Sequence, residues 1–171
     1  MVGTLFLDNN EALKSVLEYH VIGKVDDIKG YSPKEYDAFV AIGNSEVRLS
    51  LLDQLNILGF QLSTIIHATA HVSSRARLKE ETCILPGAVV HTNTVIEEGF
   101  IINVNAIVDH DTNIKKDVHI VSGAIVCSHV MIGEQSVIGA GACVKTNSKV
   151  PSFYQLQELE VYKEEGNEAN V

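Results

Sequence analysis

Residues 66–144 read IHATAHVSSRARLKEETCILPGAVVHTNTVIEEGFIINVNAIVDHDTNIKKDVHIVSGAIVCSHVMIGEQSVIGAGACV, and every sixth residue is aliphatic. The positions in this phase are Ile66, Val72, Leu78, Ile84, Val90, Ile96, Ile102, Val108, Ile114, Ile120, Val126, Ile132, Ile138 and Val144. Four residues after each of them comes a second phase that is small or apolar from Ala70 to Ala142. Neither a period of two nor one of 3.6 would stay in step for so long. A strict period of six predicts a parallel β-helix.

In such a fold each short strand forms one wall of a coil and points one aliphatic side chain inward. Burying each of these side chains stabilises the fold by about 1.5–3 kcal/mol. The small residues of the second phase suit the corners, where a large side chain would crowd the turn. The alternative is an ordinary β-sandwich with coincidental spacing, and fourteen positions in phase count against it.

The segments on either side of the repeat predict a small domain in front and a cap behind. An α/β domain with a parallel sheet is expected over residues 1–64, the β-helix over 65–150, and a cap with an acidic tail over 151–171. The expected elements of the front domain are strands Gly3–Leu7, Tyr36–Ile42 and Phe60–Ile66, and a helix from Asn44 or Ser45 to Gly59 with a stripe of Val47, Leu51, Leu55 and Leu58. Residues Gln155–Tyr162 could form a short capping helix.

Composition excludes several classes of partner. The chain has 171 residues and a formal charge of −9, which argues against nucleic acid as a partner. No apolar run approaches the length of about 20 residues that spans a bilayer, so no membrane insertion is expected. The three cysteines show no C-x-x-C spacing and indicate reduced thiols in a cytoplasmic protein.

The segment Asp109-His110-Asp111 is the main candidate for chemistry. His110 follows the inward position Val108 by two residues, so it lies outside the inward column. A carboxylate beside an imidazole fixes its tautomer and raises its basicity, which suits a general base. On spacing alone, a polar surface corner remains the alternative.

His91, His110 and His129 lie nineteen residues apart, which is one coil plus one residue. They could stack along one edge and bind a metal, as histidines do at the subunit interfaces of γ-class carbonic anhydrases. Their spacing differs from the spacing in those proteins, and loose stacking is commoner than ligation. No metal site is therefore assigned from the sequence.

The repeat resembles the hexapeptide-repeat acyltransferases, and the segment Ile101–Gly123 is similar to the bacterial nucleotide-aminosugar N-acetyltransferases and the related sialic acid O-acetyltransferases. The resemblance implies a left-handed β-helix with three repeats to a coil, here a little over four coils. It implies His110 as catalytic base, Asp111 as the acidic residue that tunes it, and Asn103 nearby. His119 would lie at the acetyl group of acetyl-CoA, and the positions along the pantetheine are Ser128 and Ala140.

The resemblance extends into the front domain, which it identifies as a small, truncated, Rossmann-like α/β domain. Phe6-Leu7-Asp8-Asn9 is similar to the family's Phe-Leu-Asp-Asp and Ala41-Ile42-Gly43-Asn44 to its second nucleotide-side loop. Asp8, Asn9 and Gly43 are therefore expected near the nucleotide. The family's first strand and its Gly-rich loop are not in this sequence, which predicts a loosened front sheet and weak nucleotide-sugar binding.

Together these features predict an acetyl-CoA-dependent acetyltransferase in which His110 is the general base. The substrate implied by the resemblance is an amino group on a nucleotide-linked sugar for surface glycan biosynthesis, and the implied assembly is a homotrimer with sites between protomers. Three alternatives stay open: a sialic acid O-acetyltransferase, a non-catalytic truncated homologue, and a metal protein similar to γ-carbonic anhydrase.

Overall fold

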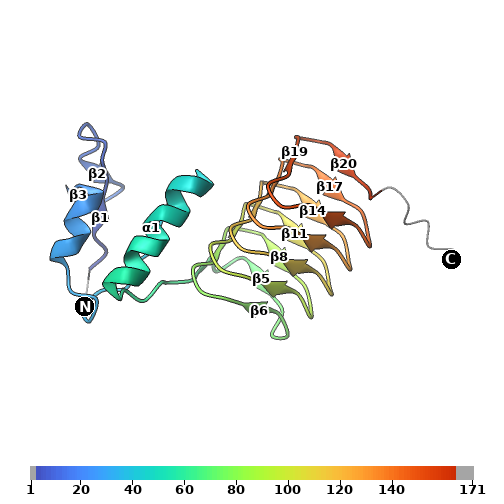
Figure 1. Ribbon diagram of the computed structural model, residues 1–171, viewed down its shortest axis with the longest axis horizontal. Coiled ribbons are helices and arrows are strands. Elements are labelled where there is room, and N and C mark those ends of the chain that lie inside the picture. Colours follow the sequence, from blue (N-terminus) through green and yellow to red (C-terminus); the bar gives the residue numbers. More distant parts are fainter. Residues whose placement is uncertain (1–2, 165–171) are drawn as a thin grey trace, which may run out of the picture. The chain divides into compact units, whose positions relative to one another are not determined.

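The computed structural model describes residues 3–164 (Figure 1). The chain forms two compact units, one from the residues up to Ala38 together with Asp53–Leu62, and another from Phe39–Leu52 and the chain from Ser63 on. Within the described residues, no helix is both long enough and apolar enough to cross a membrane. The expected acidic tail, Lys163–Val171, lies outside the described part beyond Glu164.

Residues 65–162 form a parallel β-helix, as the period of six predicts, and it has the three walls that the resemblance implies (Figure 1). The first wall consists of β4 (Ile65–Ile66), β7 (Cys83–Ile84), β10 (Ile101–Ile102), β13 (His119–Ile120), β16 (Val137–Ile138) and β19 (Gln155–Leu156). The second wall consists of β5 (His71–Val72), β8 (Val89–Val90), β11 (Ile107–Val108), β14 (Ile125–Val126), β17 (Cys143–Val144) and β20 (Val161–Tyr162). The third wall consists of β6 (Arg77–Leu78), β9 (Val95–Ile96), β12 (Asn113–Ile114), β15 (Met131–Ile132) and β18 (Lys149–Val150).

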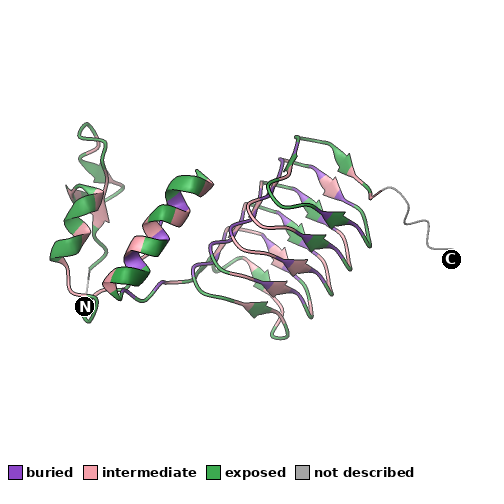
Figure 2. Ribbon diagram, viewed as in Figure 1, coloured by how far each residue is buried: buried purple, intermediate pink, exposed green. Residues whose placement is uncertain are grey.

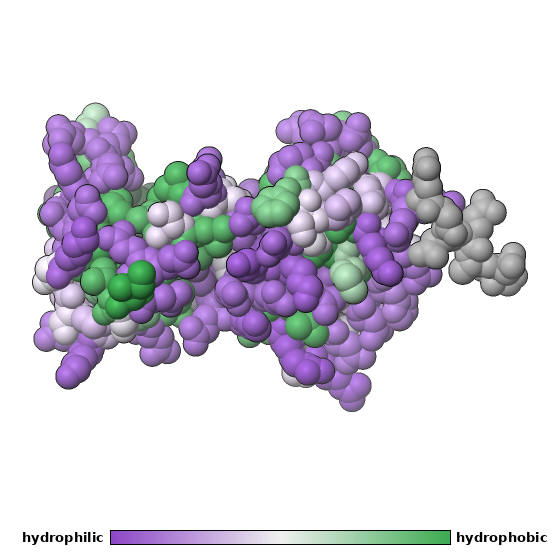
Figure 3. All heavy atoms as spheres, in the orientation of Figure 1, coloured by the Kyte–Doolittle hydropathy of each residue, from purple (hydrophilic) through white to green (hydrophobic). Residues whose placement is uncertain are grey.

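The repeat fixes the register because each strand pairs in parallel with the strand eighteen residues later, for example Ile102 with Ile120. The inward aliphatic column is fully buried from Ile84 to Val144, and the apolar residues of the second phase between them are equally buried (Figure 2). Buried hydroxyls in that phase are satisfied locally, since Thr112 Oγ1 donates to the Cys127 carbonyl at 3.2 Å. On the face seen in Figure 3, hydrophilic side chains cover much of the coil surface.

The corner between the second and third walls carries a column of left-handed residues. Asn93, Asp111, His129 and Asn147 occupy the same place in successive coils, with φ between 55° and 65°. Asn, Asp and His enter this conformation more readily than most non-glycine residues. The corner therefore repeats one backbone shape, and each coil presents a different polar side chain from it.

The expected capping helix at Gln155–Tyr162 is wrong, because these residues form β19 and β20. The period continues through Val150, Leu156 and Tyr162, so the stack has five complete coils and two walls of a sixth, beyond the expected four or so. Pro151 does not interrupt it. At this position of the repeat a backbone N–H donates to the following coil, so a proline here loses no hydrogen bond to the preceding coil. The bonds to the preceding coil are accepted by carbonyls such as Val150 O, which accepts the N–H of Gly133 at 2.9 Å.

The front unit contains fewer strand residues than expected. Its sheet is β1 (Phe6–Leu7), β3 (Tyr19–Gly23) and β2 (Ser15–Val16), with β1 parallel and β2 antiparallel to β3. A 3₁₀ helix, η1, follows at Val25–Gly30. The strands expected at Tyr36–Ile42 and Phe60–Ile66 reduce to a single parallel bridge between Ala38 and Leu62. A full pair does not form because Ile65 and Ile66 pair with β7 in the β-helix instead.

Helix α1 (Ser45–Leu58) is bounded as its sequence indicates. The Asn44 side chain accepts the N–H of Val47 at 3.0 Å as an N-cap, and Gly59 ends the helix with φ of +82°. The expected apolar stripe is shifted, since Val47 is 46% exposed and the buried residues are Arg48, Leu52 and Leu55 (Figure 2).

Arg48 lies on that buried face, where an apolar residue is usual, because it has an ion-pair partner in the coils. Its guanidinium forms an ion pair with Asp117 in which Nε donates to Oδ1 at 2.9 Å. The remaining donors reach the carbonyls of Ile42 and Gly43 at 2.7 and 3.1 Å and Ser45 Oγ at 3.2 Å. Arg48 and Asp117 are 2% and 0% exposed, so the pair is removed from water.

Glu81 lies beside this pair, and its burial predicts that the stability of the protein depends on pH. It is 3% exposed, and neither carboxyl oxygen has a hydrogen bond of normal geometry. Burial raises the pKa of Glu81 to about 7, while the Val40 backbone and the Arg48 charge oppose this and Asp117 adds to it. Because the pKa is higher in the folded state, stability should fall between about pH 4.5 and 7, by about 3 kcal/mol.

We therefore expect Glu81→Gln to stabilise the protein at pH 8 by up to about 3 kcal/mol and to change little at pH 4.5. Urea unfolding at the two pH values measures this difference. The control is Glu80→Gln, which alters the exposed neighbouring carboxylate and should change the unfolding free energy at neither pH. Equal effects of the two variants would contradict the assignment.

Candidate functional site

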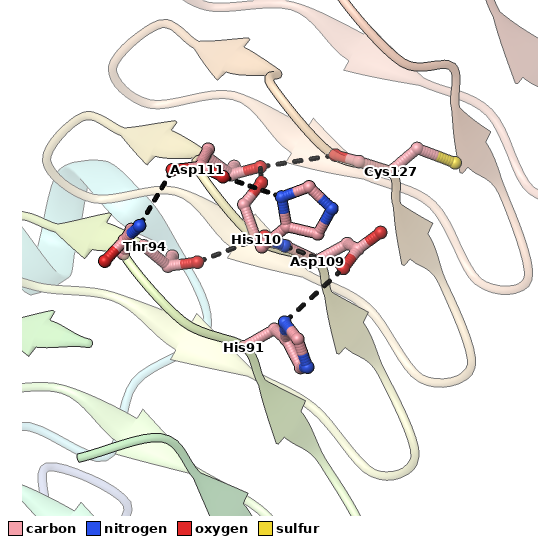
Figure 4. A network of polar contacts seen from close by, with 8 residues as sticks. His91, Thr94, Asp109, His110, Asp111 and Cys127 are labelled. Carbon is pink, nitrogen blue, oxygen red and sulfur yellow. Dashed lines mark hydrogen bonds and ion pairs between the residues drawn. The ribbon is translucent and has the colours of Figure 1, made fainter. Parts of the chain in front are cut away.

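The corner between β11 and β12 carries the candidate catalytic residues, Asp109 to Thr112 (Figure 4). The side chains of His110 and Asp111 are 37% and 39% exposed, so both can reach a ligand from the protein surface. Buried threonines hold the corner from inside the coil. Thr94 Oγ1 donates to the Asp109 carbonyl at 3.1 Å, and Thr112 Oγ1 donates to Cys127 in the next coil.

His110 and Asp111 form a direct pair, as their adjacency predicts. Nδ1 of His110 lies 2.7 Å from Oδ2 of Asp111. An ionised carboxylate only accepts hydrogen bonds, so Nδ1 carries the proton and Nε2 of the neutral ring keeps its lone pair. This hydrogen bond, with a second one from Asn93 Nδ2 at 3.1 Å, lowers the pKa of Asp111. The arrangement provides an oriented proton acceptor at Nε2.

His91, His110 and His129 stack along this edge, as their spacing allows. The ring centroids are 5.9 Å apart between His91 and His110 and 5.3 Å apart between His110 and His129. Below His110, Nδ1 of His91 lies 3.8 Å from Oδ1 of Asp109. Above it, one potential ligand atom from each of His110, Asp111 and His129 lies within 4.8 Å of the others.

A second pair lies on the first wall. Asn103 Nδ2 is 3.4 Å from His119 Nε2, at hydrogen-bond distance for an amide donor and an imidazole lone pair. Burial lowers the pKa of His119, and the positive charge of Arg48 adds to the effect. The lowered pKa favours the neutral form of His119, and in that form an Nε2 that accepts from Asn103 leaves the proton on Nδ1.

Ser128 and Ala140, the positions expected along the pantetheine, lie at two different corners of the coil. Ser128 follows His110 by eighteen residues and occupies the same corner one coil later. Ala140 lies at the corner that joins the first wall to the second. In a three-walled coil, the corner of His110 is the one opposite the first wall. One chain therefore brings His110, Asp111 and Ser128 together, and separately places Asn103 and His119 on the opposite side.

The candidate nucleotide-side residues take part in the local structure of the front segments. Oδ1 of Asp8 accepts the N–H of Asn10 at 2.7 Å, and Oδ1 of Asn9 accepts the N–H of Val25 at 3.1 Å. Gly43 belongs to the other unit, where its carbonyl accepts from Arg48. The structure therefore gives these residues turn and loop contacts, and their role toward a nucleotide stays a prediction.

Sequence reasoning missed two supporting residues of the site. Asn93 could have been found, because it precedes Asp111 by one coil of eighteen residues and shares its corner conformation. Arg48 could not, because a single arginine in an amphipathic helix normally faces solvent. Its charge is nevertheless one cause of the lowered pKa of His119.

Comparison with known proteins places these features among acetyltransferases. The family profile of the PglD N-terminal domain matches residues 2–55. The acetyltransferase domain of PglB from Neisseria gonorrhoeae, solved with acetyl coenzyme A, is 35% identical, with 91% of this chain and 75% of that chain covered and a TM-score of 0.88. PerB from Caulobacter crescentus, solved with CoA and GDP-perosamine, is 27% identical, with 88% and 73% covered and a TM-score of 0.84.

Proposed function

Because the chain belongs to the hexapeptide-repeat sugar N-acetyltransferases, with their left-handed β-helix, we propose that it transfers the acetyl group of acetyl-CoA to an amino group of a nucleotide-linked sugar. The observation that carries the proposal is the pair of His110 and Asp111 at 2.7 Å, which leaves Nε2 of His110 free to accept a proton. The relatives support both substrates, since PglB holds acetyl coenzyme A and PerB holds CoA and GDP-perosamine.

In this mechanism the sugar amine attacks the thioester carbonyl directly. A C–N bond forms, the C–S bond breaks, and CoA leaves as its thiolate, which then takes the proton that His110 has removed from the amine. His110 Nε2 takes the proton that the amine loses, and the Asp111 carboxylate stabilises the resulting imidazolium. The protonated nitrogen of the neutral His119 would donate to the developing oxyanion. No acyl-enzyme is required.

We infer that the working site forms between two copies of the chain in a homotrimer. The base and the oxyanion donor belong to one reaction, yet one chain places His110 at a corner and His119 on the opposite wall. A ring of three copies would place the corner of one against the first wall of the next. Acetyl-CoA would then lie along this seam, between Ser128 of one copy and Ala140 of the other.

The proposed function is tested by adding acetyl-CoA and a panel of UDP- and GDP-linked amino sugars, and following the release of the CoA thiol. We expect turnover with a nucleotide-linked amino sugar and none with the matched hydroxy sugar. Turnover of a sialic acid hydroxyl would favour the O-acetyltransferase alternative. Binding of acetyl-CoA with no turnover on any sugar would favour a non-catalytic homologue.

The shared site makes a quantitative prediction about mixed assemblies. His110→Ala and His119→Ala should each be nearly inactive, whereas a mixture of the two should recover about a quarter of the parental activity. Three quarters of randomly mixed trimers contain both variants, and each of these has one intact seam of three. The mixture is made by dissociating and reassembling the two variants together, and light scattering confirms its size.

The control is each variant dissociated and reassembled alone. A mixture that stays inactive, or a protein that is a monomer at working concentration, would show that the site does not span two copies.

A further inference from the structure

The part of the histidine stack formed by His110 and His129, together with Asp111, has the composition of a transition-metal site. This property is separate from the role of His110 as a base. His110, Asp111 and His129 each offer one ligand atom, and these atoms lie within 4.8 Å of one another. Two imidazoles and one carboxylate match the ligands of catalytic zinc sites, which hold the metal by three side chains and keep one position open. The sequence alone assigned no metal here, because the spacing of the histidines does not show how the rings meet.

The backbone holds these three residues in place relative to one another. His129 occupies the corner position of Asp111 one coil later, and both have the left-handed φ of that corner, 57° and 56°. The N–H of His129 donates to the carbonyl of His110 at 3.1 Å. The His129 ring meets the His110 ring edge to face at 5.3 Å, so the three side chains converge from two neighbouring turns.

The remaining gap is small enough for side-chain rotation to close. Zinc bonds of about 2.0–2.2 Å in a tetrahedral arrangement bring neighbouring ligand atoms to about 3.3–3.6 Å. His129 and Asp111 are exposed and His110 is half-buried, so their side chains can move by this amount without disturbing the packed interior of the coil. The neighbouring His91 contacts His110 from the other side and lies outside the cluster.

We propose that His110, Asp111 and His129 bind a Zn²⁺ ion, and that this ion inhibits acetyl transfer. The inhibition rests on the proposed function, because it requires His110 to be the base. A metal on Nε2 occupies the lone pair that would take the proton. A metal on Nδ1 displaces the hydrogen bond to Asp111 that fixes the tautomer. Zinc is the chosen probe because it favours imidazole, whereas Mg²⁺ favours all-oxygen sites.

Calorimetric titration of the protein with Zn²⁺ alone tests the site without any substrate. We expect one Zn²⁺ ion per chain and no binding of Mg²⁺. His129→Ala should lower the affinity for Zn²⁺ at least about tenfold, because losing even an outer partner of a metal ligand costs about 10–100-fold in affinity. His91→Ala is the matched control from the same stack and should keep the parental affinity. Zinc binding that is insensitive to His129→Ala would place the ion elsewhere, for example on the cysteines, and would overturn the proposal.

The consequence is read in the acetyl-transfer assay. Zn²⁺ should abolish turnover of the parent, and a chelator should restore it. His129→Ala should turn over normally without zinc and should resist the concentration that inhibits the parent. If the parent binds zinc at this site but keeps its activity, the inhibitory role is wrong. If no sugar is acetylated at all, the titration still reads the metal site, and the proposed function is what fails.

Discussion

His110→Ala should lower kcat about 10²–10⁴-fold, the usual contribution of a general base. The substitution removes the imidazole that Asp111 orients, since Oδ2 of Asp111 lies 2.7 Å from Nδ1 of His110. It removes no apolar contact from the coil interior, because His110 lies outside the inward column. Acetyl-CoA affinity, measured by calorimetry, should therefore stay close to that of the parent.

His91→Ala is the control for this experiment. The His91 ring lies 5.9 Å from His110 in the preceding coil, and its carboxylate neighbour is Asp109 at 3.8 Å. It shares the stack without sharing the pair with Asp111, so its removal should leave kcat close to the parental value. A parent that turns over and a His110→Ala variant with the same kcat would show that another group accepts the proton.

The repeat of six made the coils predictable because one physical requirement recurs at every turn. An inward side chain must be apolar, and the second-phase side chains are small or apolar, so the strand positions and the stack of His91, His110 and His129 follow from counting. The same count continues to Tyr162. The helix expected there is wrong because the repeat does not end at Pro151, since the N–H that proline lacks is not used toward the preceding coil.

The parts that could not be predicted depend on contacts between distant residues. Arg48 and Asp117 are sixty-nine positions apart, and no periodic pattern links a helix residue to a corner residue. The single bridge between the front segments could not be predicted either. Ile65 and Ile66 could join either sheet, and they pair with β7. The separation of His110 from His119, by contrast, follows from counting, because their nine-residue spacing is half of an eighteen-residue coil.

Arg48→Leu should destabilise the protein by about 3–5 kcal/mol, because it leaves the carboxylate of Asp117 buried without its partner. Asp117 is fully buried and its Oδ2 already has no hydrogen bond among the described residues. Burial raises the pKa of Asp117 even with Arg48 present. Without the guanidinium the main effect that opposes burial is lost, so the loss measured by urea unfolding should be larger at pH 8 than at pH 5, where the carboxyl can protonate.

Two further variants separate the lost ion pair from the lost packing. Arg77→Leu removes an exposed arginine from β6 and should change the unfolding free energy by less than about 0.5 kcal/mol. Arg48→Leu combined with Asp117→Asn removes both charges and should recover part of the loss, since the orphaned carboxylate is then gone. If the double variant is no more stable than Arg48→Leu, the arginine acts mainly through its bonds to the Ile42 and Gly43 carbonyls, and the buried charge of Asp117 is not the main cost.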